Sequence, residues 1–216
     1  MSRPIIISVG AAIFLLALVA WRFNESSPSS ETAFAPKSQP PSAAPLCPWR
    51  EPENDLKQFF PGATRYERET RILSDRRVEL AEQLGRIPTG DENALHVYCT
   101  YHEQTPLGVV MTRHVKGAYG AIELVLAVNT DGAVRGLRLQ RLREPAPIAA
   151  ALQNPDWLHS FEGRRAADSW KLGQDVPDVP EDARASAGAV VEGARSLLIL
   201  LAMAGQTHNP IVTQHH

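Results

Sequence analysis

The sequence predicts an α+β fold, a largely antiparallel sheet with packed helices, preceded by one transmembrane helix. Consecutive segments in the middle of the chain have strand patterns, a strong hairpin signal joins two of them, and helical patterns flank the group. The chain has 216 residues, of which 44% are hydrophobic. This length suits one globular domain with appendages.

An apolar, uncharged run, PIIISVGAAIFLLALVAW at residues 4–21, opens the chain. As a helix it would span roughly 27 Å, close to the hydrocarbon thickness of a bilayer. A cleaved signal peptide is the alternative. However, Leu18-Val19-Ala20 is a poor cleavage site, and Ala33-Phe34-Ala35 lies far downstream with Pro36 directly after it. The pattern therefore favours an uncleaved single-pass anchor within residues 1–23.

The remaining boundaries follow from composition. Residues 24–46 are rich in proline and serine and bury too little apolar surface to repay chain ordering, which predicts a linker. Residues 47–205 carry the strand and helix patterns of the folded domain, and residues 206–216 form a polar tail. Cys47 and Cys99 lie within the domain and leave two alternatives open, a disulfide or a buried free thiol at Cys99.

The charge pattern excludes one class of partner. The formal net charge is −2 and no basic stripe is visible, so nucleic-acid binding is not expected.

No catalytic nucleophile–base motif is present. We predict no functional metal site, although His208, His215 and His216 in the tail leave open a metal- or haem-handling role.

Two helices are expected before the strands. Residues 54–60 place apolar side chains on one face and end at Pro61-Gly62. A second helix is expected from a cap at Ser74 to Leu84, with Gly85 at its exit. Leu73 and Val78 have the spacing of a hydrophobic staple around that cap.

Four strands are expected at residues 94–101, 107–114, 121–128 and 133–143. In the first, Leu95, Val97, Cys99 and Tyr101 share one face. Asn129-Thr130-Asp131-Gly132 joins the last two strands as a hairpin. The apolar parity of the last strand slips around Gly136, as a β-bulge would make it do. Its arginines are most simply a solvated face: Arg135, Arg138, Arg141 and Arg143.

Two further helices are expected after the strands. Residues 154–162 form a short helix that carries Trp157 and Phe161. Residues 187–204 form an apolar helix that opens with small residues. Glu192 and Arg195 argue against a second membrane span, so this helix is expected to pack on the sheet.

Several segments, in this order, resemble one known family. They are FFPGATRYE at 59–67, GAYGAIELVLAVNTDGAVRGLRL at 117–139, LREPAP at 142–147, NPDWLHSFEGR at 154–164 and the small-residue turn before the last helix. Together they resemble the FMN-binding domain family, known from the G subunit of the Rnf electron-transport complex and the C subunit of the sodium-pumping NADH:quinone oxidoreductase. The resemblance implies an inner-membrane anchor, a domain facing the periplasm, and partner subunits in a membrane redox complex.

The sequence departs from the family at the point where flavin is attached. In the family a Ser-Gly-Ala-Thr segment opens the last helix, and its threonine carries FMN through a phosphoester. The aligned residues here are Ala187, Gly188, Ala189 and Val190, and valine has no oxygen to esterify. The family's Glu-Thr-Pro-Gly segment is also altered, and only Glu144 is retained from its start. Covalent FMN at Val190 is therefore excluded.

The resemblance still implies a candidate site for non-covalent FMN. Free N–H groups at the start of a helix from Ala187 would hold the phosphate, and two aromatic side chains would lie near the isoalloxazine ring. The candidate residues are Tyr119, Glu144, Trp157, Ser186, Ala187, Gly188, Ala189 and Val190. The predicted function is electron transfer within a membrane redox complex. The alternative is a cofactor-free scaffold or assembly subunit, in which Gly188 merely permits close packing and both aromatics belong to the core.

Overall fold

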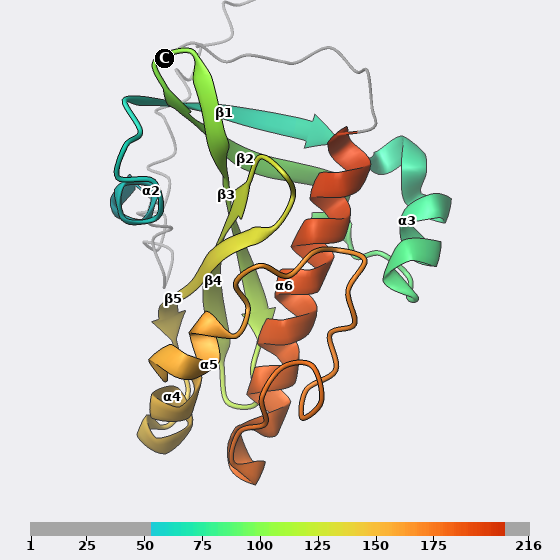
Figure 1. Ribbon diagram of the computed structural model, residues 1–216. Helices are drawn as coiled ribbons and strands as arrows, with labels where there is room; N and C mark the ends of the chain where they lie inside the picture. The colour runs from blue at the N-terminus through green and yellow to red at the C-terminus, as the bar shows by residue number, and fades with distance from the viewer. Residues whose placement is uncertain (1–52, 206–216) are drawn as a thin grey trace, which may run out of the picture. The chain divides into compact units, whose positions relative to one another are not determined.

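The computed structural model describes residues 53–205. These residues form one five-stranded antiparallel sheet in the order β1-β2-β3-β4-β5, with helices on both faces (Figure 1). The α+β prediction is confirmed for this part of the chain. The strands are β1 (Arg65–Ile72), β2 (Ala94–His102), β3 (Thr105–Lys116), β4 (Ala121–Asn129) and β5 (Val134–Leu142).

The inner strand β4, which lies between β3 and β5, is buried on both faces. Leu124 and its alternate neighbours face the larger core, which lies under the long helix α6 (Arg184–Gly205). Val125 and Ala127 face a smaller core under α2 (Glu53–Phe59), to which Leu56 and Phe60 contribute. The sheet therefore has two apolar faces, as a strand of near-continuous hydrophobic residues requires.

Strand β1 was not predicted. Its sequence, RYERETRI, is mostly charged and lacks the apolar alternation that marks a half-buried strand. It pairs with β2 along its whole length, from Arg65 opposite Tyr101 to Ile72 opposite Ala94. Because β1 is an edge strand, most of its charged side chains reach solvent while the backbone completes the sheet, and the buried Glu69 pairs with Arg71.

The expected helix 74–84 is present, but it starts differently. A 3₁₀ turn, η1 (Ser74–Arg76), precedes α3 (Arg77–Leu84), and neither start has a side-chain cap. The predicted staple is wrong, since Leu73 is fully buried whereas Val78 is 78% exposed. The 3₁₀ turn rotates Val78 away from the core. The exit is as predicted, with Gly85 in the left-handed conformation at φ 72°.

The predicted hairpin and bulge between β4 and β5 are confirmed. The Asn129 N–H donates to the Ala133 carbonyl, and Gly132 adopts a φ of 83°. The register then shifts so that Gly136 faces Ala127 while Val134 faces Val128, which leaves Arg135 as the extra residue. The bulge also allows a close approach, because a Cβ on Gly136 would lie 2.7 Å from the Phe59 ring.

Two short helices follow β5. Helix α4 (Ala146–Leu152) was not predicted, while α5 (Pro155–His159) confirms a shorter version of the expected helix. The side chain of Asn154 accepts a hydrogen bond from the Asp156 N–H and so caps α5. Trp157 and Phe161 are buried, with their ring centroids 5.1 Å apart in an edge-on arrangement.

Helix α6 lies across one face of the sheet and contacts β2, β3 and β4 (Figure 1). Helix α6 can approach the sheet closely because residue 193 is glycine. A Cβ atom at this position would clash with the side chains of Val115 and Leu124. Within residues 53–205, the stretch Glu181–Gly205 is the one helical segment long and apolar enough to cross a membrane, and 67% of its apolar 18-residue window is buried in the domain. Its packing is that of a core helix, as predicted from Glu192 and Arg195.

The predicted anchor, linker and polar tail lie outside the described residues. Those three assignments therefore stay predictions. Cys47 also lies outside them, while Cys99 is a buried free thiol in β2. Burial raises the pKa of Cys99 to about 12.

Candidate functional site

Three of the predicted site residues converge on the turn at residues 117–120 between β3 and β4. The Ala118 N–H donates to the Ser186 hydroxyl of α6 at 2.9 Å. The Tyr119 N–H donates to Glu144 Oε1 at 3.3 Å. Segments that lie 25 and 68 residues apart from this turn in the sequence therefore meet there. We call this group the turn cluster, made of the 117–120 turn, Glu144 and Ser186.

Glycines at both ends of the turn make the close contacts possible. The Gly117 N–H donates to the Gly120 carbonyl at 2.8 Å and closes the turn. A Cβ on Gly117 would clash with the Glu144 carboxylate, and one on Gly120 would lie 2.6 Å from Arg143 Cβ. Glycine is therefore needed at these two positions because neighbouring residues lie close to the backbone, and not because the backbone adopts a positive φ. Tyr119, between the glycines, is 67% exposed.

Glu144 carries an unsatisfied acceptor. Its Oε1 accepts from Tyr119, but its Oε2 is buried and has no hydrogen-bond partner. A buried carboxylate oxygen without a donor costs free energy, and such groups are rare in folded proteins. The turn cluster thus holds one acceptor that a ligand or a partner's N–H group could satisfy.

The small residues from Ser186 to Val190 do not form a turn. Helix α6 begins at Arg184, after the 3₁₀ turn η3 (Glu181–Ala183), so its start lies three residues before the expected position. In an α-helix the first four N–H groups lack partners and each later one bonds four residues back. The N–H groups from Gly188 onward are therefore engaged within α6. The expected start of the helix at Ala187 is therefore wrong, while the binding of a phosphate there stays a prediction.

The side chains at these positions are mostly enclosed. Ala187 and Val190 are fully buried in the larger core, and Ser186 is also fully buried. Gly188 and Ala189 are partly exposed, and nothing lies within 4 Å of where a Gly188 Cβ would stand. Val190 thus packs as a core side chain, and its γ-carbons do not reach the surface.

The charges around the start of α6 disfavour a phosphate. Glu181 and Asp182 lie in the turn that precedes the helix, and Asp178 lies just before it. The nearby cation, Arg184, is already paired with Asp178 at 2.9 Å and with Glu181 at 3.2 Å. A phosphate dianion would meet carboxylates and no unpaired cation in this described stretch. The residues present do not fit an FMN phosphate at the start of α6.

Trp157 belongs to a different part of the fold. Its indole N–H donates to the Pro177 carbonyl at 3.1 Å, and its ring packs on Phe161. It lines a cavity of about 310 Å³ beneath residues 177–180. Among the described residues, no hydrogen bond or ring contact joins Trp157 to Tyr119, so the structure does not bring the two aromatic residues together.

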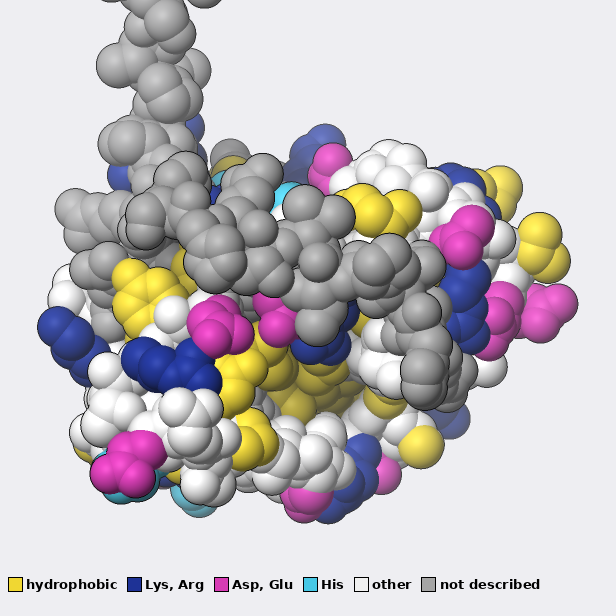
Figure 2. All heavy atoms as spheres, turned by 90° about the horizontal axis from the view of Figure 1, so that it is seen from above, with side chains coloured by type: hydrophobic (Ala, Val, Ile, Leu, Met, Phe, Trp, Pro, Cys, Tyr) yellow, Lys and Arg dark blue, Asp and Glu magenta, His cyan; other side chains and the backbone are white. Residues whose placement is uncertain are grey.

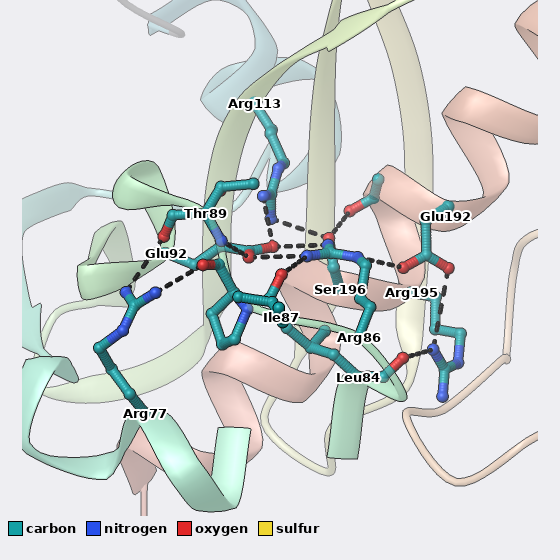
Figure 3. Close-up of polar contacts among 12 residues, drawn as sticks. Arg77, Leu84, Arg86, Ile87, Thr89, Glu92, Arg113, Glu192, Arg195 and Ser196 are labelled. Atoms are coloured by element: carbon teal, nitrogen blue, oxygen red, sulfur yellow. Dashed lines mark hydrogen bonds and ion pairs between the residues drawn. The ribbon is translucent and has the colours of Figure 1, made fainter. Parts of the chain in front are cut away.

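A second polar cluster was missed from the sequence (Figure 3). Glu92, fully buried, accepts from Arg86 at 2.7 and 2.9 Å, from Arg113 at 2.6 Å and from the Thr89 N–H at 2.7 Å. Arg113 also donates to Ser196 of α6 at 2.8 Å. Thr89-x-x-Glu92 is a capping-box pattern, so the sequence did contain a signal for part of this cluster.

The charges of this cluster support one another. Burial alone raises the pKa of Glu92, but the hydrogen bonds from Arg86, from the Thr89 N–H and from Arg113 outweigh it and lower the pKa to about 2. Arg86 reaches Glu192 of α6 as well, at 3.3 Å. The cluster therefore ties η2 (Gly90–Asn93) and β3 to the middle of α6. It is a structural brace.

Metal chemistry has no support within residues 53–205, where no group of three or more His, Cys, Asp or Glu side chains is placed to hold an ion. The histidine-containing tail lies outside these residues. On the part of the face in Figure 2 that is not drawn in grey, hydrophobic side chains lie in a hollow, and basic and acidic side chains are both present around the molecule. This mixed surface agrees with the low net charge of the sequence.

No protein-family model matches the sequence. No curated protein matches it either. Among solved structures, the chain is similar to the C subunit of the Na⁺-translocating NADH-quinone reductase from Parabacteroides distasonis, with 14% identity over 74% of this chain and 87% of that one and a TM-score of 0.47. It is also similar to NqrC from Shewanella oneidensis, with 14% identity over 76% of this chain and 94% of that one and a TM-score of 0.45.

Proposed function

We propose that this protein is a membrane-anchored subunit of a membrane redox complex, and that its domain serves there as a cofactor-free binding domain. The anchor pattern at residues 4–21 and the ordered family-like segments support the membrane complex. The domain would face the periplasm from the inner membrane, as the resemblance implies. This proposal places the scaffold alternative ahead of flavin-based electron transfer.

The cofactor-free role is supported mainly by the burial and hydrogen bonding of the first turns of α6. Val190 is fully buried, and the N–H groups from Gly188 onward are engaged within the helix. The preceding turn carries carboxylates where a phosphate would need donors. The residues from Ala187 to Val190 therefore pack as part of a core helix.

Non-covalent FMN remains the second candidate because of one specific observation. Glu144 Oε2 is buried without a partner in the turn cluster, beside the exposed Tyr119. A ligand N–H at this point would satisfy the carboxylate, and a flat ring could lie against the tyrosine. FMN would supply electron-transfer chemistry, and the chain would supply binding and position. Because the start of α6 carries carboxylates where a phosphate would need donors, this candidate ranks second.

The absorption spectrum of full-length protein purified without added flavin tests the proposal. We expect no flavin absorption and no change in melting temperature when FMN is added. Flavin that is released on denaturation, or a melting temperature that rises with FMN concentration, would overturn the cofactor-free role and establish the second candidate.

A gain-of-function experiment tests the same point from the other direction. We expect that Val190→Thr, co-expressed with a flavin transferase, stays free of covalent flavin, because residue 190 is enclosed in the core. A variant with the complete family motif between Ala187 and Glu192 serves as the control for transferase recognition. In-gel flavin fluorescence from either protein would show that the segment can still open to a cofactor.

Membrane topology needs its own measurement. A cysteine introduced at Ser26 should react with a membrane-impermeant maleimide in intact spheroplasts if the domain faces the periplasm. Labelling that appears only after the membrane is permeabilised would place the domain in the cytoplasm. A mature N-terminus downstream of Trp21 would instead show that the anchor is removed.

A further inference from the structure

Strand β5 presents an open backbone edge. It is the last strand of the sheet, and its first residue already uses this edge: the Val134 N–H donates to the Arg164 carbonyl, and the Val134 carbonyl accepts from the Gly163 N–H, both at 2.8 Å. Strand alternation beyond the bulge places the N–H and C=O groups of Leu137 and Leu139 on the same outer edge. Within residues 53–205 these groups have no backbone partner outside the sheet.

A groove of about 870 Å³ runs along this edge from Val134 to Arg138, and Leu139 follows directly after its lining. Gln58 and Phe59 of α2 line one wall, and Leu158 and His159 of α5 line the other. The two helices belong to opposite faces of the sheet, since α2 packs on the smaller core and α5 contributes Trp157 to the larger one. The edge of β5 is thus flanked by a helix on each face, which is the geometry of a slot for one more strand.

The two walls carry opposite charges. On the side of α2, Arg135 donates to the Phe59 carbonyl and Arg138 pairs with the buried Asp55. On the side of α5 the charged residues are acidic, Asp156 and Glu162, of which Glu162 pairs with the exposed His159 at 3.0 Å. A strand in the slot would point alternate side chains toward the two walls.

We propose that this slot binds an extended segment of a partner protein, which adds to β5 as a sixth strand and carries acidic side chains toward α2 and basic side chains toward α5. Main-chain hydrogen bonds to Leu137 and Leu139 would provide affinity, and the alternation of charge would provide specificity. The inference rests on the proposed role as a binding domain, and it names the surface and the chemistry of the partner.

Charge also argues against a second copy of the chain as the occupant. In a symmetric β5–β5 pairing, arginines of the two copies would share one face of the joined sheet. Like charges placed opposite each other destabilise a strand pair. An alternating acidic and basic segment meets no such penalty.

The test uses full-length protein and two labelled peptides of about eight residues, the length of a typical strand. Glutamate and lysine alternate in the first peptide. The second has the same composition, but all its glutamates precede its lysines. We expect the alternating peptide to bind about tenfold more tightly by fluorescence anisotropy, because only it can satisfy both walls at once.

Two further measurements separate strand addition from simple ionic attraction. N-methylation of the peptide amides on the edge that faces β5 should abolish binding, whereas N-methylation of the opposite edge should not. Hydrogen exchange at Leu137 and Leu139 should slow in the complex. Glu162→Lys should weaken binding, while Glu82→Lys on the exposed side of α3, away from the groove, should leave it unchanged.

Three outcomes would overturn the assignment. Equal affinity for the two peptides would mean unspecific ionic attraction, and binding that tolerates N-methylation on both edges would exclude an added strand. Self-association that Glu162→Lys removes would assign the slot to a second copy. Flavin absorption and melting are measured separately, so a failed peptide experiment leaves the cofactor-free role to be judged on its own evidence.

Discussion

Replacement of Glu92 by glutamine should reveal how much the buried brace contributes to stability. The carboxylate is fully buried and its pKa is about 2, compared with 4.5 for an unperturbed glutamate. At about 1.36 kcal/mol for each pKa unit, this difference corresponds to about 3 kcal/mol of stability at neutral pH. Glu92→Gln keeps the shape of the side chain but removes the charge that pairs with Arg86 and Arg113.

The contribution of Glu92 to the free energy of unfolding should depend on pH. Because the pKa of Glu92 is lowered in the folded protein, its contribution is fully present above the unfolded value of 4.5 and is lost as the pH falls toward about 2. The difference in unfolding free energy between wild type and Glu92→Gln should therefore be largest at neutral pH. It should be about 2 kcal/mol smaller at about pH 3.

Urea denaturation of the full-length proteins, followed by the fluorescence of the buried Trp157 and Trp170, measures this difference. Glu79→Gln on α3 provides a matched control, because Glu79 pairs with Arg76 at a carboxylate that is 47% exposed. Exposed ion pairs of this kind contribute little. A Glu92→Gln destabilisation that stays constant between neutral pH and about pH 3 would refute the argument from the lowered pKa.

Three other predictions follow from individual residues and boundaries. Cys99 is buried with a pKa raised to about 12, so we expect it to resist thiol reagents at neutral pH until the protein is unfolded; peptide mapping that finds native Cys99 labelled would contradict this. Gly117→Ala should destabilise the protein, because the added methyl group would clash with the Glu144 side chain. Gly188→Ala in α6 meets open space and should stabilise the protein by about 0.5–1 kcal/mol. Thermal denaturation of both variants measures the two effects. A fragment of residues 47–205 should unfold cooperatively on its own, since the two cores are formed within it; an aggregated fragment would mean that the fold needs the anchor or a partner.

The turn cluster shows why the candidate site could be predicted only in part. The glycines at 117 and 120 and the retained Glu144 are visible in the sequence, and the structure does bring them together with Ser186. The sequence could not show that Trp157 lies elsewhere, against Pro177. Contacts between segments far apart in the chain depend on how helices dock, and no local pattern encodes that docking.

Local chemistry by itself determined several features of this protein. Asn129 through Gly132 specifies the β4–β5 hairpin because only a residue such as glycine readily adopts the positive φ that the turn requires at position 132. The slip in apolar parity around Gly136 specifies the bulge, and the charges at Glu192 and Arg195 identify α6 as a core helix rather than a second membrane span. These features depend on residues within a few positions of one another.

Only the tertiary structure decided the rest. Strand β1 joins the sheet although its sequence is mostly charged, because pairing with β2 satisfies its backbone while its side chains stay at an edge. Helix α6 starts at Arg184 because η3 continues directly into the helix, and Val190 lies in the core. The same small residues could open a phosphate-binding turn or pack a helix against a sheet. The neighbours that surround them in space, and not their own chemistry, select the second.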